Sequence, residues 1–278
     1  MSTTNKPKQY LQGYAEFYKL RFRVTPDVLI PRPETELLVD EVIQFVKEIA
    51  AASQSPHNDA CTGRSRSVIA GEAKQSSTIL DVGTGSGNII ISLAKNLSHI
   101  GGVTFIASDI SAEALEVAKQ NAKLHGVEDQ ITFLKSDLLH SFCHSERSEE
   151  SHTEILRFTQ DDNLVIVTNL PYIPSERIPY LDSSVKDFES HVALDGGPDG
   201  FDLYRKLFQQ LKEKNWLARR SLGEGRKLKI FVGEVDYTHG ELAINEAQKN
   251  FPQAKVEVKT DLAHKQRILT ISSVSLNH

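Results

Sequence analysis

The fold is decided by the stretch Thr78-Ile79-Leu80-Asp81-Val82-Gly83-Thr84-Gly85-Ser86-Gly87-Asn88, in which a short apolar run leads into three glycines. A helical pattern begins directly after the last glycine, so the stretch predicts a strand, a tight turn and a helix. Glycine adopts positive φ readily and has no Cβ, so the main chain of this turn can approach a ligand closely. An ordinary glycine-rich turn between a strand and a helix is the alternative.

The spacing of the glycines separates two classes of cofactor-binding loop. Nicotinamide and flavin enzymes use Gly-x-Gly-x-x-Gly, whereas this loop reads Asp-x-Gly-x-Gly-x-Gly, with Asp81 before the first glycine. That order resembles the first motif of methyltransferases that depend on S-adenosyl-L-methionine. Asp81 would either order the loop or face the cationic methionyl end of such a cofactor, and the sequence leaves both roles open.

Composition limits the classes of protein to which the chain can belong. Its 278 residues are 39% hydrophobic and 25% charged, which predicts one large core, or one domain with a small appendage. The formal net charge of −5 gives no overall basic field for non-specific binding of nucleic acid. Cys61 and Cys143 lie in polar stretches and indicate no disulfide framework. No run of about 18 apolar residues occurs, so we expect a cytoplasmic protein without a membrane span. We also expect a monomer.

Strand and helix patterns alternate along the chain, which predicts a sheet covered by helices on both faces. The last two strands are separated by too few residues for a crossover helix, so they should pair antiparallel. We therefore predict an α/β, Rossmann-like methyltransferase fold: a mostly parallel seven-stranded sheet with a C-terminal antiparallel hairpin, preceded by a short N-terminal β-hairpin. The predicted strands are 78–82, 103–108, 131–135, 164–168, 228–234, 254–259 and 267–273, and the predicted helices are near 87–97, 111–125, 200–211 and 240–251.

The domain organisation predicted from these patterns has two parts. Residues 1–36 form a hairpin and linker segment, because aromatic and basic residues alternate up to Thr25-Pro26-Asp27 and prolines follow. Residues 37–278 form the catalytic domain, which opens with an amphipathic helix. Three polar insertions interrupt this domain, and their low hydrophobicity prevents each from forming a core of its own; they lie near 51–77, 143–162 and 218–227.

Histidines in the second insertion raise the question of a metal site. Cys143, His144 and His152 lie in a charged stretch without a paired Cys-x-x-Cys motif. A solvated loop explains these residues better, and no metal is predicted.

Two carboxylates follow the second and third of these strands. Asp109 lies about 20 residues after the glycine loop, where doubly wound folds place an acid that accepts hydrogen bonds from ribose hydroxyls. Its alternative role is to cap the next helix, for which Ser111 is the nearer candidate. Asp137 can accept from an adenine amino group while Leu138 packs against the ring, although a lone Asp after a strand is often only a turn residue.

The loop Asn169-Leu170-Pro171-Tyr172 follows the predicted strand 164–168, at the edge where open α/β folds bind ligands. An NH₂ group on an sp² carbon is a poor nucleophile with two protons to donate. Asn169 Oδ1 and the Leu170 carbonyl can each accept one of them, and Tyr172 can lie flat on the amide or base. Pro171 fixes the turn. We predict that this loop is catalytic and binds the substrate, the alternative being a turn without function.

Several segments together resemble the bacterial release-factor glutamine methyltransferases of the PrmC/HemK family. These enzymes methylate the side-chain amide nitrogen of the glutamine in the Gly-Gly-Gln motif of peptide-chain release factors. The resemblance covers nearly everything outside the insertions, including Tyr14 to Tyr18, Val28 to Glu36, Asp81 to Asn88, Asn169 to Ile173 and Ala193 to Gly200.

The resemblance implies S-adenosyl-L-methionine as cofactor and a release factor as protein partner. It implies that Asn169, Leu170, Pro171 and Tyr172 contact the glutamine. Together with Asp137, assigned above, the predicted cofactor contacts are Asp81, Val82, Gly83, Thr84, Gly85, Asp109, Leu138 and Asn169.

Two features depart from the family pattern. Family members usually carry a helical N-terminal domain before the hairpin, whereas this sequence begins almost at the hairpin. Their loop more often reads Asn-Pro-Pro-Tyr, but the contact at Leu170 is made through the backbone carbonyl and should tolerate the change.

Other functions remain open at this point. Asn-Leu-Pro-Tyr also occurs in adenine dimethyltransferases that act on ribosomal RNA, so an adenine N6-methyltransferase acting on DNA or RNA is the alternative. It would need a basic surface beside Tyr172, where Arg177 and Lys186 are opposed by four acids: Glu176, Asp182, Asp187 and Glu189. A folded cofactor binder without turnover is the third possibility.

Overall fold

The computed structural model describes residues 5–52, 76–142, 163–213 and 227–273. Most of the three predicted insertions, including Cys143, His144 and His152, lies outside the described residues. Within these ranges, no helix has the length and hydropathy to cross a bilayer. The same ranges hold no group of His, Cys, Asp and Glu side chains arranged to bind a metal ion.

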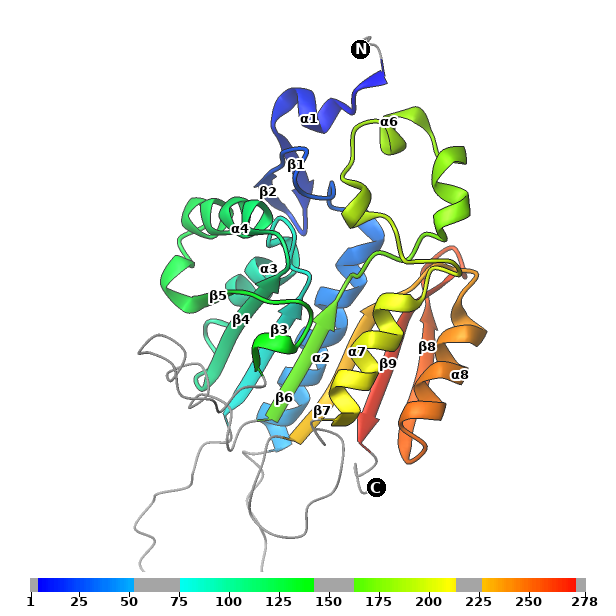
Figure 1. Cartoon of the computed structure of the whole chain (residues 1–278). Coiled ribbons are helices and arrows are strands. Elements are labelled where there is room, and N and C mark those ends of the chain that lie inside the picture. The colour runs from blue at the N-terminus through cyan, green and yellow to red at the C-terminus, as the bar shows by residue number, and fades with distance from the viewer. Residues whose placement is uncertain (1–4, 53–75, 143–162, 214–226, 274–278) are drawn as a thin grey trace, which may run out of the picture.

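A seven-stranded sheet forms the centre of the molecule (Figure 1), with the order β5-β4-β3-β6-β7-β9-β8. The first five of these strands run parallel, and β9 pairs antiparallel with both β7 and β8. This topology confirms the predicted mostly parallel sheet with a C-terminal hairpin. The strands are β3 (Ser77–Val82), β4 (Val103–Asp109), β5 (Ile131–Lys135), β6 (Asn163–Thr168), β7 (Lys227–Glu234), β8 (Ala254–Thr260) and β9 (Gln266–Ser273).

The burial of the strands explains why these sequences form them. Every residue of β3 and β6 is buried, as expected for central parallel strands with helices on both faces. The edge strand β8 instead alternates between half-buried and exposed residues, because one of its faces meets solvent. The strand order reverses between β3 and β6, which is where doubly wound sheets open a crevice for a ligand.

Helices cover both faces of the sheet and enclose two apolar clusters. One face carries α2, α3 and α4, and the other carries α7 and α8 (Figure 1). Ser111 caps α4 by accepting a hydrogen bond from the Ala114 N–H, as predicted. The helices are α2 (Glu36–Ala52), α3 (Asn88–Leu97), α4 (Ala112–Leu124), α7 (Asp202–Glu213) and α8 (Gly240–Asn250), with short turns η3 (Glu128–Gln130) and η4 (His140–Phe142).

The N-terminal hairpin packs on the main core. It consists of β1 (Tyr14–Phe17) and β2 (Leu20–Arg23), joined by Tyr18 and Lys19 at positive φ, a turn that matches the twist of the strands. Phe17 and Phe22 are fully buried in the cluster that also contains α2 and α3. The predicted hairpin is therefore present and shares its core with the larger segment, while the division at residue 36 stays a prediction. A short helix, α1 (Lys8–Gln12), precedes it and was not predicted.

A cover of three short helices lies between β6 and α7. It contains η5 (Ser175–Tyr180), α6 (Ser183–Lys186) and η6 (His191–Ala193), none of which the sequence patterns predicted. Figure 1 shows this segment beside the N-terminal segment, beyond the carboxyl ends of the parallel strands. The two segments therefore form the walls of the space above that edge of the sheet.

Candidate active site

The glycine loop joins β3 to α3 and takes the backbone shape that the sequence predicts. Gly85 has φ +54° and Gly87 has φ +80°, both in the left-handed region that favours glycine. A Cβ on Gly87 would lie 2.9 Å from Ile91 Cδ1 and 3.2 Å from Ala118 Cβ, so this glycine allows α3 and α4 to approach closely. A Cβ on Gly85 would meet nothing within 4 Å, so open space faces the loop there.

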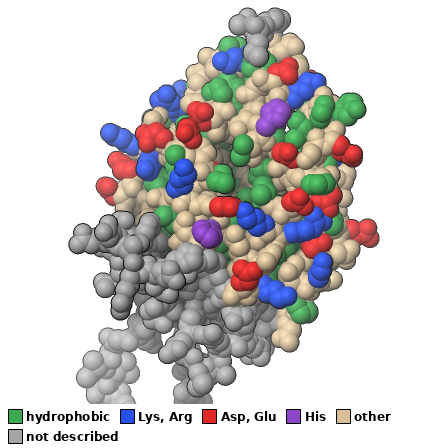
Figure 2. All heavy atoms as spheres, in the orientation of Figure 1, with side chains coloured by type: hydrophobic (Ala, Val, Ile, Leu, Met, Phe, Trp, Pro, Cys, Tyr) green, Lys and Arg blue, Asp and Glu red, His purple; other side chains and the backbone are tan. Residues whose placement is uncertain are grey.

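That open space belongs to a cavity of about 780 Å³ between the sheet edge, the N-terminal segment and the cover. Figure 2 shows hydrophobic side chains gathered around a hollow on this face, with acidic and basic side chains mixed over the surrounding surface. The predicted site residues that line the cavity are Val82, Gly83, Gly85, Asp109, Asp137, Leu138, Asn169, Leu170 and Pro171. Asp81, Thr84 and Tyr172 do not belong to the lining.

Asp109 braces the glycine loop from the end of β4. Its Oδ2 accepts the Gly85 N–H at 2.9 Å, and its Oδ1 accepts the Ser111 N–H at 2.9 Å. Because Ser111 itself caps α4, the capping role considered for Asp109 falls to its neighbour. Burial raises the pKa of Asp109, and the backbone N–H groups of Ser111 and Gly85 oppose that rise. The carboxylate keeps lone pairs that can accept hydroxyl groups from a ligand in the cavity.

Asp81 is fully buried behind the loop, at the end of β3. Its Oδ2 accepts the Thr84 hydroxyl at 2.7 Å, so the carboxylate does order the loop. Its Oδ1 has no hydrogen-bond partner among the described residues. Burial, followed by the nearby Asp109 charge, raises the pKa of Asp81 from 3.8 to about 7, while Thr84 and the backbone of Ile90 oppose the rise. A cationic ligand near this side of the loop would stabilise its charged form.

Asp137 and Leu138 form another part of the cavity wall. Asp137 Oδ2 lies 2.5 Å from Lys206 Nζ in an ion pair whose two side chains are about half exposed. The Asp137 carboxylate is therefore already paired with Lys206, a contact that the sequence did not predict. Leu138 is buried with φ +52°, a backbone conformation that is rare for a leucine and is often found at ligand sites.

A hydrogen-bond network holds the loop that follows β6. Asn169 Nδ2 donates to Thr35 Oγ1 at 3.1 Å, and the Thr35 hydroxyl donates to Glu234 Oε2 at 2.6 Å. The Tyr172 hydroxyl donates to the other oxygen, Glu234 Oε1, at 3.0 Å. Burial raises the pKa of the Glu234 carboxyl, and the hydrogen bonds from the Thr35 and Tyr172 hydroxyls oppose that rise. Burial and the negative charge of Glu234 likewise raise the pKa of Tyr172.

Thr35 and Glu234 were not identified as site residues from the sequence. Glu234 ends a predicted strand, and an acid at the carboxyl end of a central parallel strand is a signal that could have found it. Thr35 fell in the segment 1–36, which was predicted to be a hairpin and linker. It ends the short turn η2 (Pro33–Thr35) that leads into α2, and its side chain is directed to Glu234.

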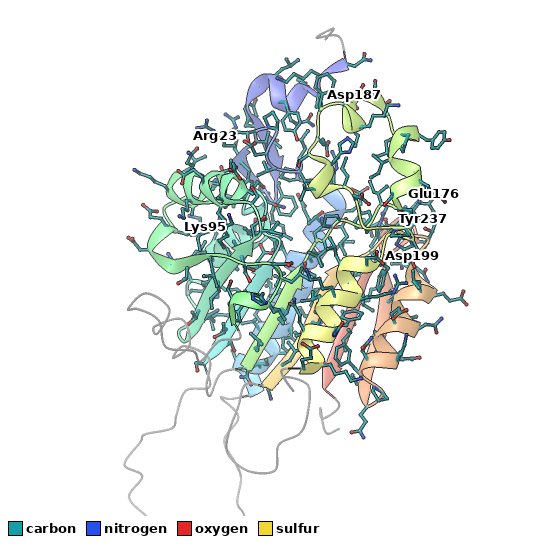
Figure 3. The ribbon with its side chains drawn as sticks, in the orientation of Figure 1. Arg23, Lys95, Glu176, Asp187, Asp199 and Tyr237 are labelled. Atoms are coloured by element: carbon teal, nitrogen blue, oxygen red, sulfur yellow. The ribbon has the colours of Figure 1, made fainter. Side chains whose placement is uncertain are left out.

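The remaining walls of the cavity come from segments outside the predicted motifs. Pro26 to Leu29 supply one side, and Lys186 to Ala193 supply the other. Figure 3 labels Arg23 on the hairpin and Asp187 on the cover, the two parts that extend beyond the sheet edge. An ion pair joins these two parts, because Arg32 Nη2, on a partly exposed side chain, lies 2.7 and 2.8 Å from the two carboxylate oxygens of the buried Glu189. Ile110, whose side chain is largely exposed, adds an apolar surface next to Asp109.

Comparison with known proteins gives relatives along almost the whole chain. Residues 73–152 match a family model described as a methyltransferase domain. A release factor glutamine methyltransferase of Bacillus cereus is 35% identical over 266 residues, covering 95% of this chain and 75% of the relative. Enzymes of the same name from Rhodopirellula baltica and Lactococcus lactis are 31% and 30% identical, covering 95% and 96% of this chain and 73% and 77% of the relatives.

Solved structures resemble the chain in fold. The N-terminal domain of human METTL16 in complex with SAH gives a TM-score of 0.53 at 14% identity, over 93% of this chain and 77% of that one. The catalytic domain of human METTL16 in complex with a hairpin of the MAT2A 3′UTR gives 0.56 at 12% identity, with the same coverage. At these identities the likeness concerns the fold alone, and it agrees with the predicted methyltransferase architecture.

Proposed function

The chain belongs to the release factor glutamine methyltransferases, and from this premise we propose that it methylates the glutamine of the Gly-Gly-Gln motif in a peptide-chain release factor. Its methyl donor is S-adenosyl-L-methionine. The methyl group would go to the side-chain amide nitrogen. The observation that carries the proposal is the orientation of Asn169, whose Nδ2 is engaged by Thr35 so that Oδ1 is left as an acceptor at the cavity wall.

The residues around the cavity fit this cofactor. The space in front of Gly85 admits a ligand against the main chain, and Asp109 can accept hydrogen bonds from ribose hydroxyls. Leu138 and Asp137 would hold the adenine, with Asp137 shared between the ligand and Lys206. Val82, Gly83 and Thr84 complete the loop. When bound, the cofactor supplies a methyl group on a positively charged sulfur, and the buried Asp81 places a carboxylate behind the loop that holds it.

Binding of the glutamine amide would depend on two acceptors. Asn169 Oδ1 and the Leu170 carbonyl take one amide proton each, which fixes the plane of the amide and directs the nitrogen toward the methyl group. Pro171 lies in the cavity wall and limits the freedom of this loop. Tyr172 lies outside the cavity lining and would hold the end of this loop through the bond of its hydroxyl to Glu234.

Positioning would supply most of the rate enhancement in this reaction. The amide nitrogen is a weak nucleophile because its lone pair is delocalised, so a fixed short approach and exclusion of water matter more than a strong base. An amide nitrogen that has gained a methyl group is strongly acidic, so its proton would pass to solvent water without a dedicated base. The chain then needs only to hold the two reacting groups in line.

A direct assay tests the proposal. Purified protein, S-adenosyl-L-methionine and a class 1 release factor should give one added methyl group on the Gly-Gly-Gln glutamine by peptide mass spectrometry. A release factor with that glutamine replaced by alanine is the matched negative substrate. Asn250→Ala, on α8 and outside the cavity lining, is the control variant for Asn169→Ala.

Three results would overturn the proposed substrate, each pointing elsewhere. Methyl transfer to adenine in an oligonucleotide, with none to the release factor, would favour the adenine N6-methyltransferase. Cofactor binding without transfer to any substrate would favour a binding protein. Methyl transfer to another residue of the release factor would keep the protein substrate and exclude the Gly-Gly-Gln glutamine.

A further inference from the structure

We propose that Thr35 and Glu234 are positioning residues that decide which end of the Asn169 amide faces the substrate. The inference rests on the proposed function, because an acceptor is needed there only if the substrate presents an NH₂ group. Neither residue lines the cavity, so each would act through Asn169 rather than by touching the substrate.

The direction of the hydrogen bonds in this network follows from the groups that take part. We take Glu234 to be an ionised carboxylate, which accepts the Tyr172 hydroxyl on Oε1 and the single hydroxyl proton of Thr35 on Oε2 at 2.6 Å. The Thr35 oxygen is then left with lone pairs alone for its second neighbour. It therefore accepts from Asn169 Nδ2 at 3.1 Å and could not donate to Asn169 Oδ1.

The direction of the hydrogen bond between Asn169 and Thr35 determines which end of the Asn169 amide faces the substrate. With Nδ2 turned to Thr35, Oδ1 occupies the other branch of the Asn169 amide and can accept a substrate proton. If the amide were rotated by half a turn, its NH₂ group would meet the NH₂ group of the substrate. Two donors would then oppose each other, and one would be left unpaired in a partly buried site.

The same carboxylate also holds the far end of the catalytic loop. Glu234 Oε1 accepts the Tyr172 hydroxyl at 3.0 Å, so one side chain fixes the first and last residues of Asn-Leu-Pro-Tyr. Glu234 and Thr35 are 1% and 2% exposed; both carboxylate oxygens of Glu234 accept a hydroxyl, and the Thr35 hydroxyl both donates and accepts. A buried pair whose hydrogen bonds are all made holds a single arrangement, which suits groups that must orient Asn169.

The three parts of the network come from distant segments of the chain. Thr35 lies in the turn before α2, Asn169 follows β6 and Glu234 ends β7. Because β6 and β7 are neighbours in the sheet, their carboxyl ends place Asn169 and Glu234 at the same edge. The N-terminal segment thereby contributes a side chain to the orientation of the catalytic loop.

Thr35→Val tests the proposal, because it removes the hydroxyl while keeping a branched side chain of similar size. The kcat for release factor methylation should fall roughly 10- to 100-fold, the range expected when a reacting group loses its alignment. Affinity for S-adenosylhomocysteine, measured by calorimetry, should stay within about twofold, since Thr35 is not part of the cofactor wall. Thr35→Ser keeps the hydroxyl and should retain kcat within about threefold.

Thr270→Val on β9 is the matched control. Thr270 is also a buried threonine, but its hydroxyl bonds to the Glu257 carbonyl and its residue is not in the cavity lining. A loss of thermal stability without loss of kcat is expected there. If Thr35→Val kept full kcat, or if Thr35→Ser lost as much as Thr35→Val, the positioning role would be wrong.

A measurement on the unaltered protein tests the orientation without turnover. In a nuclear magnetic resonance spectrum, the Nδ2 protons of Asn169 should show a cross-relaxation contact with the Thr35 methyl group, and Asn169→Asp should remove that signal. The absence of this contact would overturn the proposal even if the enzyme methylates release factors. Its presence in a protein that methylates no release factor would remove the proposed function and leave the orientation in place. The test also stands should Thr35→Val fail to fold.

Discussion

Replacing Asp81 by Asn should make the protein more stable at neutral pH. Asp81 is fully buried, one of its oxygens has no partner among the described residues, and burial raises its pKa to about 7. A carboxyl whose folded pKa lies above its unfolded value keeps its proton in the folded state while the unfolded chain has already lost it. Stability from this group is therefore greatest below pH 4, falls as the pH rises from about 4 to 7, and is constant above.

The size of the expected stability gain follows from the pKa of Asp81. Each pKa unit corresponds to about 1.4 kcal/mol, so the rise from 3.8 to about 7 is worth at most about 4 kcal/mol. The amide of Asn is itself a buried polar group, whose cost offsets part of the gain. We expect Asp81→Asn to raise the free energy of unfolding at pH 8 by about 2 kcal/mol.

Urea denaturation of both proteins between pH 4 and 8 measures this effect. The difference in unfolding free energy should grow with pH and level off above pH 7. Asp129→Asn is the matched control, because Asp129 is exposed in the turn η3, and it should leave the pH dependence unchanged. A variant that is no more stable than the unaltered protein at pH 8, or a difference that does not vary with pH, would refute the reasoning.

Two further substitutions test other parts of the site. Asp109→Ala should weaken binding of S-adenosylhomocysteine, measured by calorimetry, roughly 100-fold. Hydrogen bonds to a charged group are worth about 1.5–3 kcal/mol, and the bond from the Gly85 N–H that holds the loop is also lost. Unchanged affinity would exclude the ribose role of Asp109. Arg32→Met should lower the free energy of unfolding by about 2 kcal/mol in urea, because it leaves the buried Glu189 carboxylate unpaired. Glu189→Gln leaves no buried charge and should lower the free energy of unfolding by less than Arg32→Met does. A larger loss for Glu189→Gln than for Arg32→Met would contradict this explanation.

Local patterns were sufficient to predict the sheet. The strands β3 and β6 are continuous apolar runs buried on both faces, so their sequences alone identify them. Ser111 was predicted as a cap because capping depends on residues only three positions apart. The glycine loop and the Asn169 loop were found because each follows such a strand directly.

Contacts between distant segments explain what the sequence did not predict. Thr35 and Glu234 are 199 positions apart, and no local pattern connects them. The ion pair between Asp137 and Lys206 is likewise made across the fold. The cover between β6 and α7 consists of short helical turns, whose positions are set by packing rather than by periodicity. Tyr172 was expected against the substrate, and the contact observed for its hydroxyl is with Glu234.

The account depends most on the claim that Asn169 holds the substrate amide for methyl transfer. The measurement that tests it directly is the single-turnover rate of methyl transfer to a release factor by Asn169→Ala, with S-adenosylhomocysteine affinity determined on the same sample. We expect the rate to fall at least about 100-fold, as when one preorganised hydrogen-bonding group is removed from an active site, while the folded state and measurable cofactor binding persist. A rate equal to that of the unaltered protein would contradict the account.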